Sequence, residues 1–393
     1  MNKFKYYFIL LLAGISLVSC SKKDDDEPVV VPLRDYKTQY DVDNANIEEY
    51  LKTNYITVNA DMDVTISLIT DPSTQPSIMS YLNSDSFPKL LLRDIDLHGI
   101  AYKMYYLVLR EGVGTSPMNT DGVVAAYRGE YLSRIEKTVT VPSHLTTTFF
   151  EQVLYPNSAF DLYGAIMGWS EIFPQFKTGT TSVNADGSNK YENFGAGVLF
   201  IPSGLGYYAS PPASSTIPVY SPLIFSFKLY DFKRLDHEYV ISNGAIVGTP
   251  DGVLDINEDI DGDGYVRDYR NTTLYPNKPV NPDDTDGDGI PDFLDSDDDG
   301  DGYTTRFEIT KPSGAPVTGV SLYYPWDPVV DNPATPNTNE SETFGIPRKP
   351  TGELTDPAKP ESIDNPRKFV DDDYAAAGRK RIHVDNTYPY QKK

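Results

Sequence analysis

Hydrophobic and polar positions predict a series of strands through the middle of the chain. In the segment at residues 221–232, Leu223, Phe225 and Phe227 occupy alternate positions, as one buried face of a strand requires. Similar runs of β-branched and aromatic residues predict further strands at residues 101–112, 122–132, 144–154 and 195–203. The pattern therefore predicts a β-rich domain.

Helical periodicity is confined to two short segments. NIEEYLKTNYI at residues 46–56 predicts a short amphipathic helix ahead of the strands. SEIFPQF at residues 170–176 predicts a second helix, which Ser170 starts and Pro174 interrupts. The polar, turn-rich residues 178–193 predict an insertion or a long hairpin.

The composition of the chain changes twice. Beyond about residue 236 it turns to Asp, Gly, Asn and Pro, and beyond residue 311 it is Pro-rich and polar. We expect this last part to pack as extended segments on other parts or to be partly disordered. The resulting division is a signal peptide at residues 1–19, a polar tether at 20–34, an N-terminal extension with a helix at 35–98, a sheet domain at 99–235, an Asp-rich segment at 236–310 and a polar tail at 311–393.

Residues 1–20 have the pattern of an export signal. Lys3 and Lys5 precede an apolar stretch that is short for a membrane span and that ends in the letters LVSC. This ending resembles a bacterial lipobox, which implies acylation of Cys20 and a membrane as partner. Because Cys20 is the one cysteine of the chain, no thiol then remains for a disulfide or for catalysis.

The residues after Cys20 form a charged tether that reads SKKDDDEPVVVP. Its acidic run resembles the signal that sends lipoproteins to the outer cell surface in some diderm bacteria, and it also has the composition of a disordered linker. We therefore expect an outer-membrane lipoprotein, at the cell surface or on the periplasmic face.

The charge of the chain is strongly negative, with 57 acidic against 34 basic residues and a formal charge of −23. This balance argues against nucleic acid as a partner, because no basic surplus is left to neutralise phosphates. It favours cations or a solvated tail. The four histidines are scattered and suggest neither a histidine-based metal site nor a catalytic triad.

Four motifs follow one another in the predicted sheet domain. Each motif is weak alone, but four in this order and spacing are specific. They are similar to motifs of the FKBP family of peptidyl-prolyl isomerases, over roughly residues 99–232. The motifs are VVAAYRG (123–129), FDLYGAIMGW (160–169), IPSGLGYY (201–208) and IPVYSPLIF (217–225).

The resemblance implies an α+β fold in which an antiparallel sheet wraps around one short helix. A shallow aromatic pocket would lie between sheet and helix, with Trp169 at the start of the helix and on the pocket floor. Aromatic residues at strand spacing also fill cores, so Trp169 would be core and site together. The residues that the resemblance places at the pocket are Tyr127, Phe150, Glu151, Phe160, Ala165, Ile166, Trp169, Tyr207, Ile217 and Phe225.

The resemblance also implies an activity, the cis–trans isomerisation of X-Pro bonds in exported polypeptides, without a cofactor. Tyr207 would donate a hydrogen bond to the backbone of the bound peptide. Two positions depart from the family: Glu151 follows Phe150 where an aspartate is usual, and Tyr208 replaces a glycine. These departures favour a rival interpretation, a non-catalytic surface module that binds proline-containing segments.

Alternate carboxylates followed by a glycine recur within residues 255–308. Aspartates at positions 1, 3 and 5 with a glycine at position 6 can supply the oxygen ligands that calcium prefers. Glu308 occupies position 12 of the third loop, whereas the first loop has Arg270 there unless Asp268 substitutes. The expected ligands are Asp259, Asp261, Asp263, Asp284, Asp286, Asp288, Asp292, Asp295, Asp297, Asp299, Asp301 and Glu308.

The spacing of these loops resembles thrombospondin type 3 repeats more than paired EF-hands. In such repeats, calcium ions order a chain that has almost no apolar core, and here only Ile290, Phe293 and Leu294 are available to pack. The resemblance implies a non-globular Asp-rich segment ordered by structural Ca²⁺. The alternative, a solvated acidic linker, would not require glycines in register.

Overall fold

The computed structural model describes residues 32–140, 142–242, 244–312, 319, 321–331 and 341–389. The helices and strands of this part all lie within the unit Tyr36–Lys393. The predicted signal peptide and Cys20 lie outside the described residues. Within the described part, no helix has the length and the apolar composition needed to cross a bilayer.

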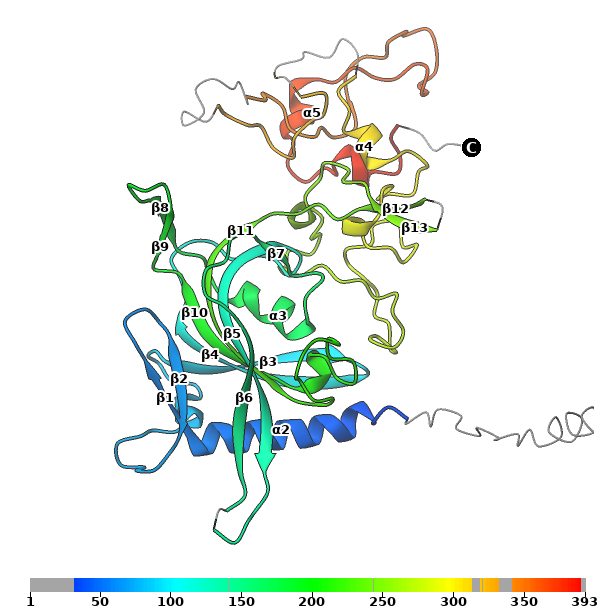
Figure 1. Ribbon diagram of the computed structural model, residues 1–393. Coiled ribbons are helices and arrows are strands. Elements are labelled where there is room, and N and C mark those ends of the chain that lie inside the picture. Colours follow the sequence, from blue (N-terminus) through cyan, green and yellow to red (C-terminus); the bar gives the residue numbers. More distant parts are fainter. Residues whose placement is uncertain are drawn as a thin grey trace, which may run out of the picture. The chain divides into compact units, whose positions relative to one another are not determined.

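A seven-stranded antiparallel sheet positions the candidate site (Figure 1). Its strands are β3 (Lys89–Leu97), β4 (Ile100–Arg110), β5 (Gly122–Ile135), β6 (His144–Val153), β7 (Phe160–Asp161), β10 (Gly195–Ile201) and β11 (Leu223–Lys233). They follow the order β3-β4-β10-β11-β5-β6, and β7 pairs with β5. Each strand expected from the sequence is present, and β3 joins the sheet from the region expected to be an extension.

Helix α3 (Met167–Ile172) fills the concave face of this curled sheet, as Figure 1 shows. The three residues that the sequence assigns to one face of β11, Leu223, Phe225 and Phe227, all pack there in one cluster with Trp169. A curled antiparallel sheet around one short helix is compatible with an FKBP-like fold.

The start of α3 differs from the prediction. The helix begins at Met167, before Ser170, and a 3₁₀ turn, η2 (Phe173–Gln175), follows it. The prediction relied on Ser170 as N-cap. Instead, the Ser170 hydroxyl donates to the Met167 carbonyl at 3.1 Å, inside the helix. Trp169 therefore lies within α3, while Pro174 falls in η2, where the α-helix has ended as expected.

Gly168 allows α3 to approach β10 closely. A Cβ atom at this position would lie 2.7 Å from Cγ2 of Ile201. We expect Gly168→Ala to lower the free energy of unfolding by about 1–3 kcal/mol, although alanine favours a helix. Chemical denaturation of the full chain measures this, with Gly248→Ala as control, because a Cβ there meets no atom within 4 Å. Equal effects of the two substitutions would contradict the close approach.

Helix α2 (Tyr36–Thr53) packs against the opposite face of the sheet. Tyr105 and Leu107 of β4 pack in one cluster with Ile47 and Leu51 of α2. The residues of β4 that alternate with these two point to the other face of the sheet and pack in the cluster that contains α3. Burial on both faces explains why β4 and β10 are apolar at nearly every position.

Helix α2 begins earlier and ends earlier than the segment predicted at residues 46–56. Its first turns are fixed by a tertiary contact, because the Tyr40 hydroxyl accepts a hydrogen bond from the Lys103 backbone at 2.8 Å. The residues after its end are rich in β-branched side chains and form β1 (Asn54–Val58), which pairs with β2 (Val64–Leu68).

Shorter elements surround the sheet. The predicted hairpin is present as β8 (Thr180–Val183) and β9 (Asn189–Glu192). A second hairpin follows the sheet, and short helices and 3₁₀ turns lie elsewhere along the chain. They are β12 (Tyr239–Ser242), β13 (Ala245–Gly248), α4 (Thr305–Glu308), α5 (Asp371–Ala375), η1 (Ile78–Tyr81), η3 (Ser203–Leu205), η4 (Asp255–Asn257), η5 (Asp292–Leu294) and η6 (Ile382–Val384).

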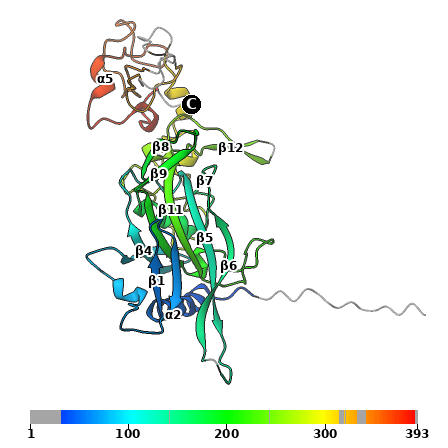
Figure 2. The same ribbon diagram turned by 60° about the vertical axis from the view of Figure 1, so that its left-hand side comes forward.

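The described part of the tail beyond residue 311 is packed, although it has few regular elements (Figures 1 and 2). The hydroxyl oxygens of Tyr324 and Tyr374 lie 3.2 Å apart inside a hydrophobic cluster. The buried members of this cluster are Val253, Ile309, Tyr324, Ile346, Tyr374 and Ile382. Extended segments therefore bury apolar side chains here without forming a sheet.

Candidate functional site

A cavity of about 470 Å³ opens beside α3, between residues of β5, β6 and β11. Five of its fifteen lining residues are aromatic, and Glu151 and Asp161 also line it. Of the pocket residues expected from the sequence, those that line it are Tyr127, Glu151, Phe160, Ala165, Ile166, Trp169, Tyr207 and Phe225. Sequence reasoning did not foresee the other lining residues, which are Ala125, Val153, Pro156, Asn157, Ser158, Asp161 and Gly164.

The two remaining predicted residues, Phe150 and Ile217, support the cavity from behind. The Phe150 ring meets the Phe225 ring edge-on, with 5.6 Å between centroids. Gly129 leaves room for Phe150, because a Cβ at Gly129 would lie 2.5 Å from Cζ of that ring. Ile217 is buried in the same hydrophobic cluster as Phe225.

Trp169 is both core and cavity floor. Its side chain is 6 % exposed and lines the cavity. The rings of Tyr127 and Phe225 stand nearly perpendicular to the indole, with centroids 4.8 and 4.9 Å away, an arrangement that aromatic rings favour. The indole N–H has no hydrogen-bond partner among the described residues. This nitrogen is itself buried, so the indole presents its ring to the cavity as part of the core.

Tyr127 and Glu151 both line the cavity wall. Burial raises the pKa of Tyr127 to about 12, and the neighbouring Glu151 adds to this effect. Burial also raises the pKa of Glu151, and the neighbouring Tyr127 partly opposes it. The glutamate thus lies beside the tyrosine although it is longer than the aspartate usual in the family.

Tyr208 anchors the loop that presents Tyr207. Its φ of 50° lies in the left-handed region, which the glycine usual at this position would adopt more easily. The Tyr208 ring stacks on Tyr36 of α2 at 4.3 Å and meets Tyr220 edge-on at 4.8 Å. These aromatic contacts offset the unfavourable backbone conformation and hold the loop against α2.

His237 connects the cavity rim to the segment that follows the sheet. Its Nε2 lies 3.1 Å from the Asp161 carboxylate, and its Nδ1 lies 2.7 Å from Asp255. Burial alone would lower the pKa of His237, but its two carboxylate partners raise it to about 10. The histidine is therefore positively charged at neutral pH and joins the two carboxylates.

The three Asp-Gly loops share one internal geometry. In each loop the glycine at position 6 has a positive φ and donates its backbone N–H to the first aspartate. Two of the predicted ligand sets converge so that one oxygen of each member lies within 4.8 Å of the others, a spacing that could hold a cation. These sets are Asp259, Asp261 and Asp263, and Asp284, Asp286 and Asp288.

Asp292 and Asp295 accept hydrogen bonds from nearby residues of the Asp-rich segment. Asp292 accepts hydrogen bonds from the Thr285 backbone at 2.8 Å and from the Thr285 hydroxyl at 2.7 Å. Asp295 accepts the Asp297 backbone N–H at 3.1 Å. Both predicted ligands therefore have a local structural partner in addition to their proposed role.

The first loop has a partner that sequence reasoning missed. Arg270 pairs with Asp268 at 2.8 Å, so Asp268 is already engaged. Asp283 lies beside this loop instead and accepts the Ile260 backbone N–H at 2.8 Å. Burial, together with Asp259 nearby, raises the pKa of Asp283 to about 6. It escaped prediction because it falls outside the repeating spacing.

Glu308 of α4 faces the third loop. It is buried, and neither of its carboxylate oxygens has a hydrogen-bond partner among the described residues. Burial, with Asp299 and Asp301 nearby, raises the pKa of Glu308 to about 11. A carboxylate in such surroundings is favourable only when it is protonated or beside a cation.

Part of the chain matches a known family. The family model described as BamM C-terminal matches residues 249–337, the part that carries the three Asp-Gly loops. No curated protein matches the chain.

Several solved structures are similar to part of the chain. A peptidyl-prolyl cis-trans isomerase from Pseudomonas syringae pv. tomato is 14 % identical, over 52 % of this chain and 100 % of its own, with a TM-score of 0.28. FkpA from Escherichia coli is 24 % identical over 33 % of this chain and 48 % of its own, with a TM-score of 0.21. The three FKBP domains of wheat FKBP73 are 15 % identical over 36 % of this chain and 51 % of theirs, with a TM-score of 0.25.

Proposed function

We propose that this protein is an FKBP-type peptidyl-prolyl cis–trans isomerase that assists the folding of exported proteins. The observation that carries the proposal is the aromatic cavity, with Trp169 as its floor and with Tyr127, Phe160 and Phe225 in its wall. Its clients would be polypeptides that contain proline.

The chemistry would follow from the surface of the cavity. Rotation about an X-Pro bond must break amide resonance, which raises a barrier of about 18–20 kcal/mol. The twisted amide is less polar than the planar one, so contact with the aromatic rings of the cavity favours it over its hydrated planar form. Tyr207 lines the cavity, and its hydroxyl is a donor that would hold a flanking peptide carbonyl.

Calcium is a structural cofactor in this proposal and takes no part in catalysis. The converging aspartates of the Asp-Gly loops and the buried, unpaired Glu308 support it, because oxygen-rich, negatively charged sites suit Ca²⁺. The ion would order a segment that has few apolar side chains of its own.

We place the protein at the outer membrane, attached by a lipid at Cys20, on either the surface or the periplasmic face. The lipobox-like sequence supports the anchor. The match of residues 249–337 to the BamM C-terminal family supports a location among outer-membrane assembly proteins. Clients would then be polypeptides in transit to or through that membrane.

Isomerisation of a short proline peptide by the full chain tests the proposed activity. We expect acceleration by the wild type and a decrease in kcat/KM of about tenfold or more in Trp169→Leu and in Tyr207→Phe. Tyr191→Phe is the matched control, because Tyr191 lies in the β8–β9 hairpin and does not line the cavity. Circular dichroism checks that each variant folds.

The rival interpretation predicts a different outcome. A folded wild-type chain whose Trp169 fluorescence changes with the peptide, but which does not accelerate isomerisation, would be a binding module. Acceleration that is equal in all variants would place the activity outside this cavity.

A further inference from the structure

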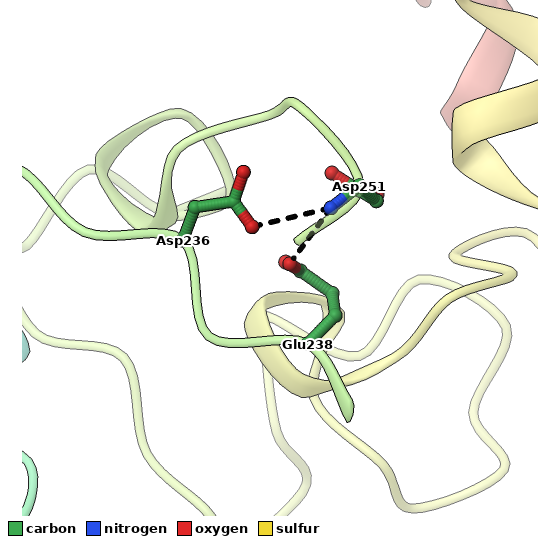
Figure 3. Close-up of side chains that lie close together, drawn as sticks. All are labelled: Asp236, Glu238 and Asp251. Carbon is green, nitrogen blue, oxygen red and sulfur yellow. Dashed lines mark hydrogen bonds between the residues drawn. The ribbon is translucent and has the colours of Figure 1, made fainter. Parts of the chain in front are cut away.

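A second group of carboxylates lies outside the three Asp-Gly loops. Most of its members precede the first loop, and one, Asp298, belongs to the third loop without being one of its predicted ligands. Figure 3 shows one part of the group, where Asp236 and Glu238 both point toward the backbone N–H of Asp251, each with an oxygen 3.2 Å from the nitrogen. No spacing rule brings these residues together in the sequence.

The members of this group are buried and short of partners. Glu258 is 2 % exposed and Asp298 is 1 % exposed, and both oxygens of each lack a hydrogen-bond partner among the described residues. One oxygen in each of three further buried carboxylates is also without a partner, in Glu238, Asp251 and Asp255. Since buried polar atoms are almost always satisfied, this concentration of unpaired, negatively charged oxygens favours a cation as their common partner.

Carboxylates of this group converge. Asp251, Glu258 and Asp298 each bring an oxygen within 4.8 Å of the others, and Glu238, Asp255 and Glu258 do the same. Glu258 belongs to both sets, so one carboxylate lies at the centre of the group.

No ion pair joins Glu258 or Asp298 to a basic side chain in the part of the chain that the structure describes, although Arg306 lies beside Asp251 and donates to its backbone carbonyl at 3.1 Å. His237 is nearby, but its two ring nitrogens face Asp161 and Asp255. Ionised together without a cation, the carboxylates of this group would repel one another strongly.

We propose that Asp251, Glu258 and Asp298 bind a buried structural calcium ion, next to Glu238 and Asp255, which also converge with Glu258. Glu258 and Asp298 each offer two unpaired oxygens and Asp251 offers one, which approaches the roughly six to eight ligands that Ca²⁺ takes. A set made of carboxylates alone favours a hard cation over zinc, which prefers cysteine and histidine.

The ion would connect segments that are distant in sequence. Glu258 immediately precedes Asp259, the first predicted ligand of the first loop, and Asp298 lies in the third loop. His237 contacts Asp255 with one ring nitrogen and Asp161, at the rim of the aromatic cavity, with the other. This site would therefore fix the first and third loops to each other and to the segment that follows the sheet.

Calorimetric titration of the calcium-free full chain with Ca²⁺ tests this site. We expect Glu258→Gln and Asp298→Asn each to bind one ion fewer than the wild type, and the double variant to lose the same single ion. Glu353→Gln, an exposed glutamate of the tail, is the matched control and keeps the wild-type stoichiometry. An unchanged stoichiometry in both single variants would overturn the proposal.

Thermal unfolding provides a second readout if one variant binds too weakly to titrate. Without calcium, Glu258→Gln should unfold at a higher temperature than the wild type, because one buried negative charge is removed. With calcium, its gain in melting temperature should be smaller than that of the wild type. Equal calcium-dependent gains in both chains would show that Glu258 is a protonated core residue and would overturn the site.

Discussion

Replacing Glu171 with alanine is expected to destabilise the protein by about 3–5 kcal/mol, the range typical of a broken buried ion pair. Glu171 lies on α3 and is 1 % exposed. It accepts hydrogen bonds from Arg267 and from Arg93, whose Nη2 lies 2.8 Å from Oε2. Alanine would leave two guanidinium groups close together without a counter-ion. The backbone carbonyl of residue 171 accepts a hydrogen bond from the Tyr265 hydroxyl at 2.9 Å, and the substitution leaves this bond in place.

Chemical denaturation of the full chain measures this effect. The matched control is Glu192→Ala, which removes an exposed ion pair with Lys190 in the β8–β9 hairpin, at 2.8 Å between Nζ and Oε1. An exposed pair contributes about 0–1 kcal/mol, so the control should be nearly neutral. Similar losses in both variants would contradict the importance of the buried contact.

The contribution of Glu171 should also depend on pH. Burial alone would raise the pKa of Glu171, but Arg267 and Arg93 lower it below its ordinary value. The stabilisation is therefore fully present above the pKa of the unfolded chain and is lost as the pH falls through the lower pKa of the folded chain. The difference in stability between the wild type and Glu171→Ala should shrink in acid.

Removal of calcium is expected to disorder residues 255–308 and to leave the sheet folded. The apolar cluster in this segment is small, with Val266, Phe293 and Leu294 as its buried members there. Each ion present at about a hundredfold excess over its Kd would contribute about 2.7 kcal/mol. Without these contributions, amide hydrogen exchange in the segment should accelerate about tenfold or more.

Exchange measured by mass spectrometry, with and without a chelator, tests the effect of calcium. Peptides from β10 and β11 serve as an internal control, because these strands belong to the central sheet. Returning Ca²⁺ should restore protection. Mg²⁺ should restore less, because it demands a smaller octahedral site. Unchanged exchange after chelation would contradict a structural role for calcium in this segment.

The strands of the sheet could be predicted because their signal is local. Alternating Leu223, Phe225 and Phe227 and the continuous apolar run of β10 reflect burial that each strand experiences along its whole length. The limits of α2 and α3 were less accurate. Tyr40 and Ser170 make contacts in the folded chain that no rule based on local spacing or capping contains.

The residues of the candidate sites also fall into two kinds, those that a local sequence pattern predicts and those that long-range contacts bring together. Except for Glu151, the expected residues that line the cavity belong to motifs that follow one another along the sequence, so a local pattern brings them into view. Asp161 escaped prediction because its role comes from His237, which approaches it from another part of the chain. The Asp-Gly loops are local and were visible, whereas Glu258 and Asp298 meet only after folding. Long-range assembly therefore marks the limit of what the sequence could predict.

Helix α3 has only six residues, yet it serves two neighbours. Trp169 forms the floor of the aromatic cavity, and Glu171 forms an ion pair with Arg267, which follows the aspartates of the first Asp-Gly loop in the sequence. A substitution that shifts α3 would therefore disturb the cavity floor and the position of Arg267 together.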